Sequence, residues 1–287
     1  MPNWKEEELS QYCVNCGANG LSESLDYTQP DLTYDPDLIP KQNHDVDVYF
    51  EKYPNKDFFA GLNHLFAGLK WEISEEQNKD WQAEWKKGFV PFQLCGPYWV
   101  VPSWMDSPTQ PQYSITIDPG MAFGTGTHAT TQMAAYFIHK LCEKKKQLQE
   151  MSLLDVGTGT GILAMLAKKH GVGRVVGVEI DAEARRVARE NININQLSSI
   201  QLPETQIEEL KEKFDIVVAN IIDGVLLQLR EALLRQMKAG GNLFLTGILA
   251  ERENDFFEAF ITASGLQVVR RLEQDEWIGY WLRSAAP

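Results

Sequence analysis

The stretch L-L-D-V-G-T-G-T-G at residues 153–161 decides the fold of this chain. Its first four residues have the composition of a short buried strand, and an apolar helix is predicted directly after it, from Ile162 to Lys169. A strand, a glycine-rich turn and a helix in this order typically bring bare backbone N–H groups against a nucleotide-like ligand. Glycine is needed there because a Cβ would hold the ligand away and because the turn can require a positive φ.

The spacing of these glycines distinguishes between ligands. The dinucleotide fingerprint is G-x-G-x-x-G, whereas this turn has G-x-G-x-G and places Ile162 where the third fingerprint glycine would be. The turn is not a P-loop either, because no Gly-Lys-Ser/Thr follows it. The pattern D-x-G-x-G-x-G at residues 155–161 resembles the first motif of class I methyltransferases, which bind S-adenosylmethionine (SAM). An ordinary strand–helix loop that holds several glycines is the alternative.

Length and composition predict a soluble globular protein. A chain of 287 residues is expected to form one large or two ordinary domains, and its hydrophobic share of 44% and charged share of 23% are typical values. No apolar run approaches the roughly 20 residues of a membrane span, and the acidic segment from Met1 to Glu8 lacks the apolar core of a signal peptide. Four cysteines do not indicate a disulfide framework in a chain this long, so the expected location is the cytoplasm.

Negative charge is concentrated near the N-terminus. The whole chain carries −13, and residues 1–90 hold 8 Lys and no Arg against 17 Asp and Glu, a net charge of −9. The first Arg of the chain is Arg174. An acidic region without Arg is a poor phosphate binder and suits a basic protein partner. A merely solubilising surface is the alternative.

Three segments are predicted: an N-terminal α+β substrate-recognition domain at residues 1–76, a connector at 77–91, and a catalytic domain at 92–287. In the first, hydrophobic periodicity predicts helices over 4–16 and Asn55–Phe66 and strands over 21–27, His44–Phe50 and Leu69–Ile73. This layout suggests a ferredoxin-like fold. Cys13 and Cys16 form a C-x-x-C pair, but no second Cys or His pair accompanies them, which favours a buried or incidental pair over a metal or redox site.

From residue 92 onward, the sequence predicts a doubly wound α/β sheet of class I methyltransferase type, mostly parallel with an antiparallel edge hairpin. Strands alternate with helices, as in parallel sheets, and the last two strands follow each other directly, which implies the hairpin. The predicted strands are 98–104, 114–117, 151–156, 174–180, a weak one near 199–202, 214–219, 242–248, 266–272 and 277–283. The predicted helices are 129–140, 161–170, 182–195, 223–238 (ended by Gly240-Gly241) and 251–263.

Two polar residues end strands near the glycine-rich turn. Glu179 lies 22 residues after Gly157, where a carboxylate can accept both hydroxyls of a ribose. Asn220 ends the strand 214–219, and ligands of open α/β sheets bind beyond the carboxyl ends of the strands. A short amide there can accept a hydrogen bond from an amine substrate and orient its lone pair. The alternatives are a surface acid at 179 and a helix-capping Asn at 220.

Four motifs together carry a family resemblance: D-P-G-x-A-F-G-T-G-T-H-x-T-T at 118–131, L-D-V-G-T-G-T-G-I-L-A at 154–164, V-V-G-V-E-I-D at 175–181 and V-V-A-N-I at 217–221. They resemble the ribosomal protein L-eleven methyltransferases, the PrmA family. The segments D-W-x-x-E-W-K at 80–86 and W-V-V-P-S-W at 99–104 also match. The resemblance covers residues 80–287 well and the first ~75 in layout only. The family commonly has Asp where this chain has Glu179 and Pro where it has Ala129.

The resemblance implies SAM as cofactor, no metal, and a basic protein of the large ribosomal subunit, L-eleven, as partner, with neither DNA nor a membrane. The cofactor-binding residues that it implies are Phe123, Thr127, Thr131, Gly157, Gly159, Glu179 and Asn220. Asn220 is also the implied catalytic residue. The implied reaction is SN2 transfer of a methyl group from sulfonium to a lysine side-chain or N-terminal amine, for which the protein supplies alignment and a deprotonated amine. His128 is a candidate general base, and a structural histidine is the alternative.

Two other functions stay open. The first is a class I N-methyltransferase for another amine, such as a nucleic-acid base. Asn220 is followed by Ile-Ile and not by the Pro-Pro-aromatic that cradles a planar base, which counts against it. The second is a SAM-binding adaptor without catalysis, against which the intact turn and Asn220 argue.

Overall fold

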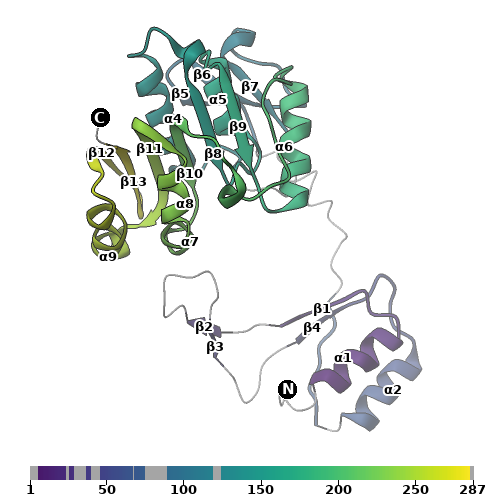
Figure 1. The fold of residues 1–287 in the computed structure, drawn as a ribbon. Coiled ribbons are helices and arrows are strands. Elements are labelled where there is room, and N and C mark those ends of the chain that lie inside the picture. The colour runs from purple at the N-terminus through teal and green to yellow at the C-terminus, as the bar shows by residue number, and fades with distance from the viewer. Residues whose placement is uncertain are drawn as a thin grey trace. The chain divides into compact units, whose positions relative to one another are not determined.

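The computed structural model describes residues 6–23, 26–28, 37–39, 46–66, 68–74, 89–118 and 124–284 (Figure 1). The chain divides into two compact units, Met1–Asp80 and Trp81–Pro287. The connector tryptophans, Trp81 and Trp85, lie outside the described residues. None of the helices in the described ranges combines the length and the apolar character that crossing a membrane requires.

The first unit packs two helices around a small aromatic core. Its elements are α1 (Glu6–Asn15), β1 (Gly20–Glu23), β2 (Asp26–Thr28), β3 (Asp37–Ile39), β4 (Val46–Tyr49) and α2 (Lys56–Leu65). Strands β1 and β4 pair antiparallel, as do β2 and β3, and the single strand predicted over 21–27 is therefore divided between β1 and β2. The core consists of Leu9, Cys13, Phe58, Leu62 and Phe66. The ferredoxin-like arrangement stays a prediction.

The strand predicted over Leu69–Ile73 is wrong. These residues have no strand pairing, and the ring of Trp71 lies 5.1 Å from the ring of Phe59 on α2. The indole Nε1 of Trp71 also donates to Oδ1 of Asn63 at 3.4 Å. The segment therefore packs against a helix, a contact that alternation of apolar residues cannot distinguish from strand pairing.

The C-x-x-C pair of the first unit consists of free thiols. Cys13 is buried, which raises the pKa of its thiol to about 11, whereas Cys16 is exposed. Within the described part of the chain, no three His, Cys, Asp or Glu side chains gather where they could hold a metal ion.

The second unit is built on a six-stranded sheet in the order β12-β13-β11-β10-β8-β9 (Figure 1). Its strands are β8 (Ser152–Val156), β9 (Arg174–Val178), β10 (Phe214–Asn220), β11 (Met237–Leu249), β12 (Gln267–Gln274) and β13 (Trp277–Arg283). Strands β9, β8, β10 and β11 are parallel, while β13 runs antiparallel to both β11 and β12. The predicted doubly wound sheet with an antiparallel edge hairpin is confirmed.

Apolar helices cover both faces of this sheet. One face packs against α4 (Ala129–Cys142) and α5 (Ile162–Lys169), and the other against α7 (Asp223–Gln228), α8 (Arg230–Arg235) and α9 (Glu253–Phe256). The side chains of β8 alternate between the two cores, with Leu153 in the first and Leu154 in the second. The remaining helix, α6 (Ala182–Ile194), follows β9. The weak strand expected near 199–202 is reduced to a single bridge from Gln201 to Val176.

A second, three-stranded sheet leads into the site. It contains β5 (Phe92–Cys95), β6 (Tyr98–Pro102) and β7 (Ser114–Ile117), with β5 antiparallel and β7 parallel to β6. Strand β5 was not predicted from the sequence. Strand β7 ends at Ile117, directly before Asp118, the first residue of the motif that resembles the methyltransferase family.

The single helix predicted over 223–238 is also wrong. The chain breaks at Leu229 into α7 and α8 and enters β11 at Met237, before Gly240-Gly241. Buried Gln236 fixes this early end. Its side-chain Nε2 donates to the backbone carbonyls of Ile207 and Leu210, and its backbone carbonyl accepts from the N–H of Phe214. Gly240, at φ 72°, lies within the irregular start of the pairing between β10 and β11.

Candidate active site

Three predicted site residues lie in one row at the carboxyl edge of the sheet. Asn220 is the last residue of β10, Gly157 directly follows β8, and Glu179 directly follows β9. The ends of these three strands are paired with one another. Thr246 of β11 pairs with Asn220 and extends the row to a fourth strand. Because neighbouring parallel strands end in the same direction, these residues face the edge where ligands of such sheets bind.

The glycine-rich turn of residues 157–161 has the backbone that its sequence predicts. Gly157, Gly159 and Gly161 have φ angles of 68°, 53° and 82°, a region that residues with a Cβ rarely adopt. A Cβ on Gly157 would also lie 3.0 Å from the side chain of Ile221, the residue after Asn220. The turn is therefore restricted to glycine by conformation and, at Gly157, by space.

The expectation that this turn presents bare N–H groups is wrong for four of its five residues. The N–H groups of Gly157 and Thr158 donate to the carbonyl of Val178 at 2.9 and 3.1 Å, and that of Gly161 donates to the carbonyl of Thr158 at 2.8 Å. The N–H of Gly159 donates to Oε2 of Glu179 at 3.0 Å. Four donors of the turn are thus used within the protein. The turn suits a ligand that packs against its Cβ-free backbone better than a pyrophosphate, which needs several free donors.

Asp155, the first residue of the motif, bonds both the glycine-rich turn and the helix that follows it. The residue is 1% exposed, and its Oδ2 accepts from the hydroxyl of Thr158 at 2.6 Å and from the N–H of Ala164 on α5 at 3.2 Å. Burial raises the pKa of this carboxyl to about 7, although both hydrogen bonds act in the opposite direction. Its Oδ1 is buried without a partner among the described residues. Sequence reasoning gave Asp155 no role of its own.

The carboxylate of Glu179 is oriented by backbone amides. Its Oε2 accepts from Gly159, and its Oε1 accepts from the N–H of Asp181 at 3.1 Å. Each oxygen keeps lone-pair capacity for a further donor, such as a ribose hydroxyl. Asp181, two residues later, is a second carboxylate near this place, but its Oδ1 caps α6 by accepting from the N–H groups of Glu183 and Ala184.

Asn220 is held between two buried threonines. Its Nδ2 donates to Oγ1 of Thr131 on α4 at 3.0 Å, and its Oδ1 accepts from Oγ1 of Thr246 at 3.0 Å. Both threonines are 0% exposed. The helix-capping alternative does not apply, because the N-cap of α7 is Ile222, which makes no side-chain capping bond. The structure thus brings Thr131 and Asn220 together, while Thr246 was missed by sequence reasoning.

The residues before α4 include two predicted site residues. The hydroxyl of Thr127 lies 3.0 Å from that of Thr125, and its carbonyl accepts from Gln132 at 3.2 Å. Phe123 lies outside the described residues. His128 is the N-cap of α4: its Nδ1 accepts from the N–H of Thr130 at 3.4 Å and lies 2.8 Å from the Thr130 hydroxyl. These contacts support the structural reading of His128 over a general base.

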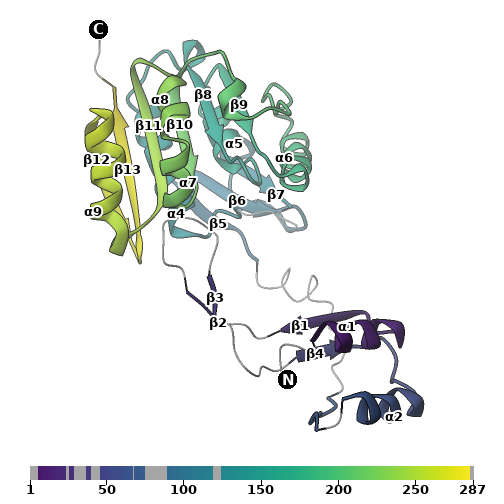
Figure 2. The same ribbon diagram turned by 60° about the horizontal axis from the view of Figure 1, so that its bottom comes forward.

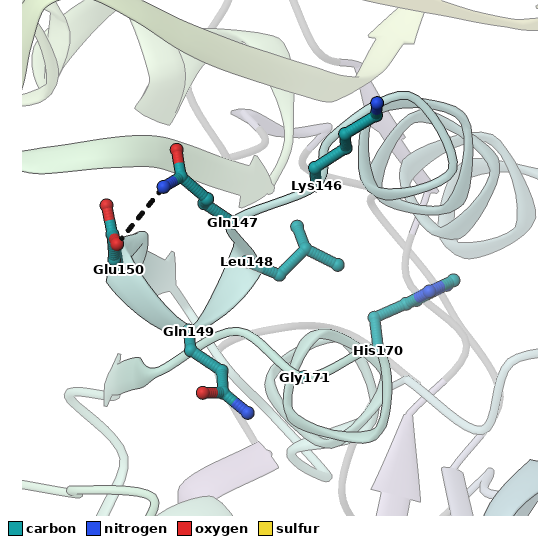
Figure 3. Close-up of a pocket in the computed structure, with 7 residues that line it drawn as sticks. All are labelled: Lys146, Gln147, Leu148, Gln149, Glu150, His170 and Gly171. Carbon is teal, nitrogen blue, oxygen red and sulfur yellow. Dashed lines mark hydrogen bonds between the residues drawn. The ribbon is translucent and has the colours of Figure 1, made fainter.

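A polar depression of about 490 Å³ lies at the opposite edge of the sheet, before the start of β8 (Figure 3). His170, Gly171 and the segment 146–150 line it, and Nε2 of Gln147 donates to Glu150 at 3.3 Å. Burial and the neighbouring His139 lower the pKa of His170 to about 4. The lining contains no residue of the predicted site, so the depression is separate from the row of Asn220, Gly157 and Glu179.

Comparison with known proteins identifies similar chains. The family model described as ribosomal protein L11 methyltransferase (PrmA) matches residues 1–284. A ribosomal protein L11 methyltransferase of Escherichia coli is 37% identical over 283 residues, covering 94% of this chain and 92% of its own. The protein of that name from Pelobacter propionicus is 37% identical over 250 residues, covering 85% and 80%. The crystal structure of a ribosomal protein L11 methylase from Lactobacillus delbrueckii subsp. bulgaricus has a TM-score of 0.60 and 30% identity, covering 68% of this chain and 100% of its own.

Proposed function

The chain belongs to the ribosomal protein L11 methyltransferase (PrmA) family, and we propose that it methylates lysine side-chain or N-terminal amines of ribosomal protein L11 (L-eleven) in the cytoplasm. It is a SAM-dependent methyltransferase. The observation that carries the amine specificity is Asn220, a neutral amide fixed at the carboxyl edge of the sheet beside the glycine-rich turn.

The residues of the row fit SAM. The turn offers the Cβ-free backbone of three glycines with four of its five N–H donors already used, and SAM has no phosphate that would need them. The residues that we assign to the cofactor are Phe123, Thr127, Thr131, Gly157, Gly159, Glu179 and Asn220. Glu179 would accept the ribose hydroxyls, since both of its oxygens are oriented by backbone amides and keep free lone pairs. When bound, SAM supplies an electrophilic methyl group on a positively charged sulfur.

The chemistry left to the protein is binding and alignment of the amine. Asn220 accepts a hydrogen bond from the amine N–H, which directs the nitrogen lone pair toward the cofactor. Its neighbours Thr131 and Thr246 are uncharged and buried. A partly buried place beside neutral groups disfavours the ammonium form of the substrate and favours the nucleophilic amine.

The N-terminal region is proposed to select the protein substrate. Residues 1–76 would recognise L11, residues 77–91 would connect, and residues 92–287 would carry the reaction. The acidic composition of residues 1–90, without Arg, supports a basic protein partner over a nucleic acid. DNA and membranes are not expected partners.

Methyl transfer from radiolabelled SAM to purified L11 tests this function, with a variant of L11 whose lysines are arginine and whose α-amine is blocked as the control. Label in wild-type L11 and none in the control is the expected result. Label in RNA but not in L11 would support the nucleic-acid alternative. SAM binding by calorimetry without transfer to any acceptor would support the adaptor.

A further inference from the structure

Two buried polar side chains, Thr160 and Asn191, connect the glycine-rich turn to the chain that leads into α4. Both residues are 0% exposed. Nδ2 of Asn191 on α6 donates to the carbonyl of Thr160 at 3.0 Å, and Oδ1 of Asn191 accepts from the N–H of Asp118 at 2.8 Å. The hydroxyl of Thr160 donates to the carbonyl of Gly124 at 2.6 Å. Together these bonds form a relay from Asp118 through Asn191 and Thr160 to Gly124.

The chemistry of the partners fixes the direction of the relay. Asn191 bonds one backbone N–H and one backbone carbonyl, so its amide cannot be turned over without losing both bonds. The hydroxyl of Thr160 faces a carbonyl and must donate to it. Removing Asn191 leaves the carbonyl of buried Thr160 without this donor, and removing the Thr160 hydroxyl takes a donor from the partly buried carbonyl of Gly124; losing a bond to a buried group costs more than losing one between exposed groups.

The relay connects two parts of the candidate site, which form its two walls: the glycine-rich turn and the segment that leads into α4. Thr160 belongs to the turn, whose neighbour Gly159 bonds Glu179. Gly124 begins the segment that enters α4, and α4 carries Thr131, the partner of Asn220. The relay therefore joins the wall that we assign to the ribose and methionine parts of SAM to the wall that holds the catalytic amide.

We propose that Thr160 and Asn191 are positioning residues for SAM binding, which set the spacing between the glycine-rich turn and the Thr131–Asn220 pair. This inference rests on the proposed assignment of the turn to SAM. Neither side chain needs to touch the cofactor, because each acts through the backbone of residues on the two walls. Loss of the relay should weaken SAM binding more than it slows methyl transfer at saturating SAM.

Asn195, the C-cap residue of α6, provides a matched control. It lies one turn after Asn191, and its Oδ1 accepts from the N–H of Thr116 on β7 at 2.9 Å while its Nδ2 donates to the carbonyl of the same residue. Strand β7 and α6 lie side by side (Figure 2). Asn195 bonds Thr116 within β7, and Asn191 bonds Asp118, the residue that follows this strand. Asn195 thus ties the same two elements together, but its bonds do not reach the glycine-rich turn.

The experiment compares four variants of the full chain: Thr160→Val, Thr160→Ser, Asn191→Ala and Asn195→Ala. Calorimetry measures SAM affinity, steady-state methylation of L11 separates KM for SAM from kcat, and thermal melting reports stability. We expect Thr160→Val and Asn191→Ala to raise Kd and KM for SAM about tenfold while kcat falls less than threefold. Thr160→Ser keeps the hydroxyl and should stay within twofold of the wild type. Asn195→Ala should lower Tm but leave SAM affinity within threefold.

Equal losses of SAM affinity in Asn191→Ala and Asn195→Ala would overturn the proposal, because both would then act through stability alone. Wild-type affinity in Thr160→Val would overturn it as well, and this variant decides the question if Asn191→Ala does not fold. A wild-type chain without measurable SAM affinity would instead refute the assignment of the turn to SAM, on which the inference rests.

Discussion

Replacing Asn220 by alanine should reduce turnover far more than cofactor affinity. The amide receives the substrate N–H, so its contribution is greatest when the lone pair is aligned for transfer. A single hydrogen bond of this kind, made chiefly in the transition state, is worth roughly a hundredfold to a thousandfold in kcat. The part of the SAM site assigned to Gly157, Gly159 and Glu179 does not depend on this side chain, so the variant loses only the contribution to SAM binding that we assign to Asn220 itself. We therefore expect kcat of Asn220→Ala to fall about a hundredfold and the affinity for SAM to change less than threefold.

The same substitution has a cost in stability that the structure bounds. It leaves the hydroxyls of Thr131 and Thr246, both 0% exposed, without their partner. An unsatisfied buried polar group costs about 1–3 kcal/mol, and hydroxyls can rotate toward other acceptors, so the loss should lie near the lower end for each. Asn220→Asp is the matched control, because it keeps the shape and an acceptor oxygen, and the Thr131 hydroxyl can donate to the second oxygen.

The assay is methyl transfer from radiolabelled SAM to L11 under saturating cofactor, together with calorimetry of SAM binding and urea unfolding. Asn220→Asp should keep the stability of the wild type but lower kcat more than tenfold, because its negative charge favours the ammonium form of the substrate. The reasoning is refuted if Asn220→Ala loses SAM affinity by the full factor while kcat stays intact, since Asn220 would then be a cofactor residue only.

Three further changes test other parts of the site. Gly157→Ala should weaken SAM binding about tenfold, because the new Cβ would lie 3.0 Å from the side chain of Ile221. Gly171→Ala is the control for backbone strain alone, because Gly171 has a φ of 97° and open space around it, and this variant should keep wild-type SAM affinity in calorimetry. Burial raises the pKa of the Asp155 carboxyl from an ordinary 3.8 to about 7, so ionising this group opposes folding. As pH rises from about 4 to above 7, the free energy of unfolding of the wild type, measured in urea, should fall by up to about 4 kcal/mol relative to Asp155→Asn. Parallel pH profiles of the two proteins would contradict this. Deletion of residues 1–76 should leave SAM affinity within a few fold and abolish methylation of L11; full activity on L11 after deletion would show that the recognition role is wrong.

The alternation of strands and helices along the sequence predicted the main sheet well, because buried parallel strands are apolar and are separated by amphipathic helices. The errors lie where local pattern and tertiary contact disagree. Leu69–Ile73 alternates like a strand but packs Trp71 on α2. Met237 enters β11 early because buried Gln236 bonds the segment 207–210, a contact about 30 residues away in sequence.

The site residues also divide into those that local sequence pattern could predict and those that it could not. Gly157, Glu179 and Asn220 could be found from sequence because each follows or ends a recognisable strand, and strand ends mark the ligand edge of such a sheet. Thr160, Asn191 and Thr246 could not, because their partners are distant backbone groups or another side chain. A polar residue on the buried side of an amphipathic helix, as Asn191 is, was the available signal, but it does not say what the side chain bonds.

The place of β13 in the sheet constrains the order in which the second unit can fold. This strand comes after β12 in the chain, yet it lies between β12 and β11. A nascent chain that has emerged only as far as Gln274 would leave the edge of β11 unpaired and give β12 no neighbour to join. The contact of Trp281 with Phe244, at 5.3 Å between rings, closes the core only when β13 is inserted. Completion of the sheet must therefore wait until residue 283 has left the ribosome, and a chain stopped before Trp277 loses an interior strand and not merely an edge.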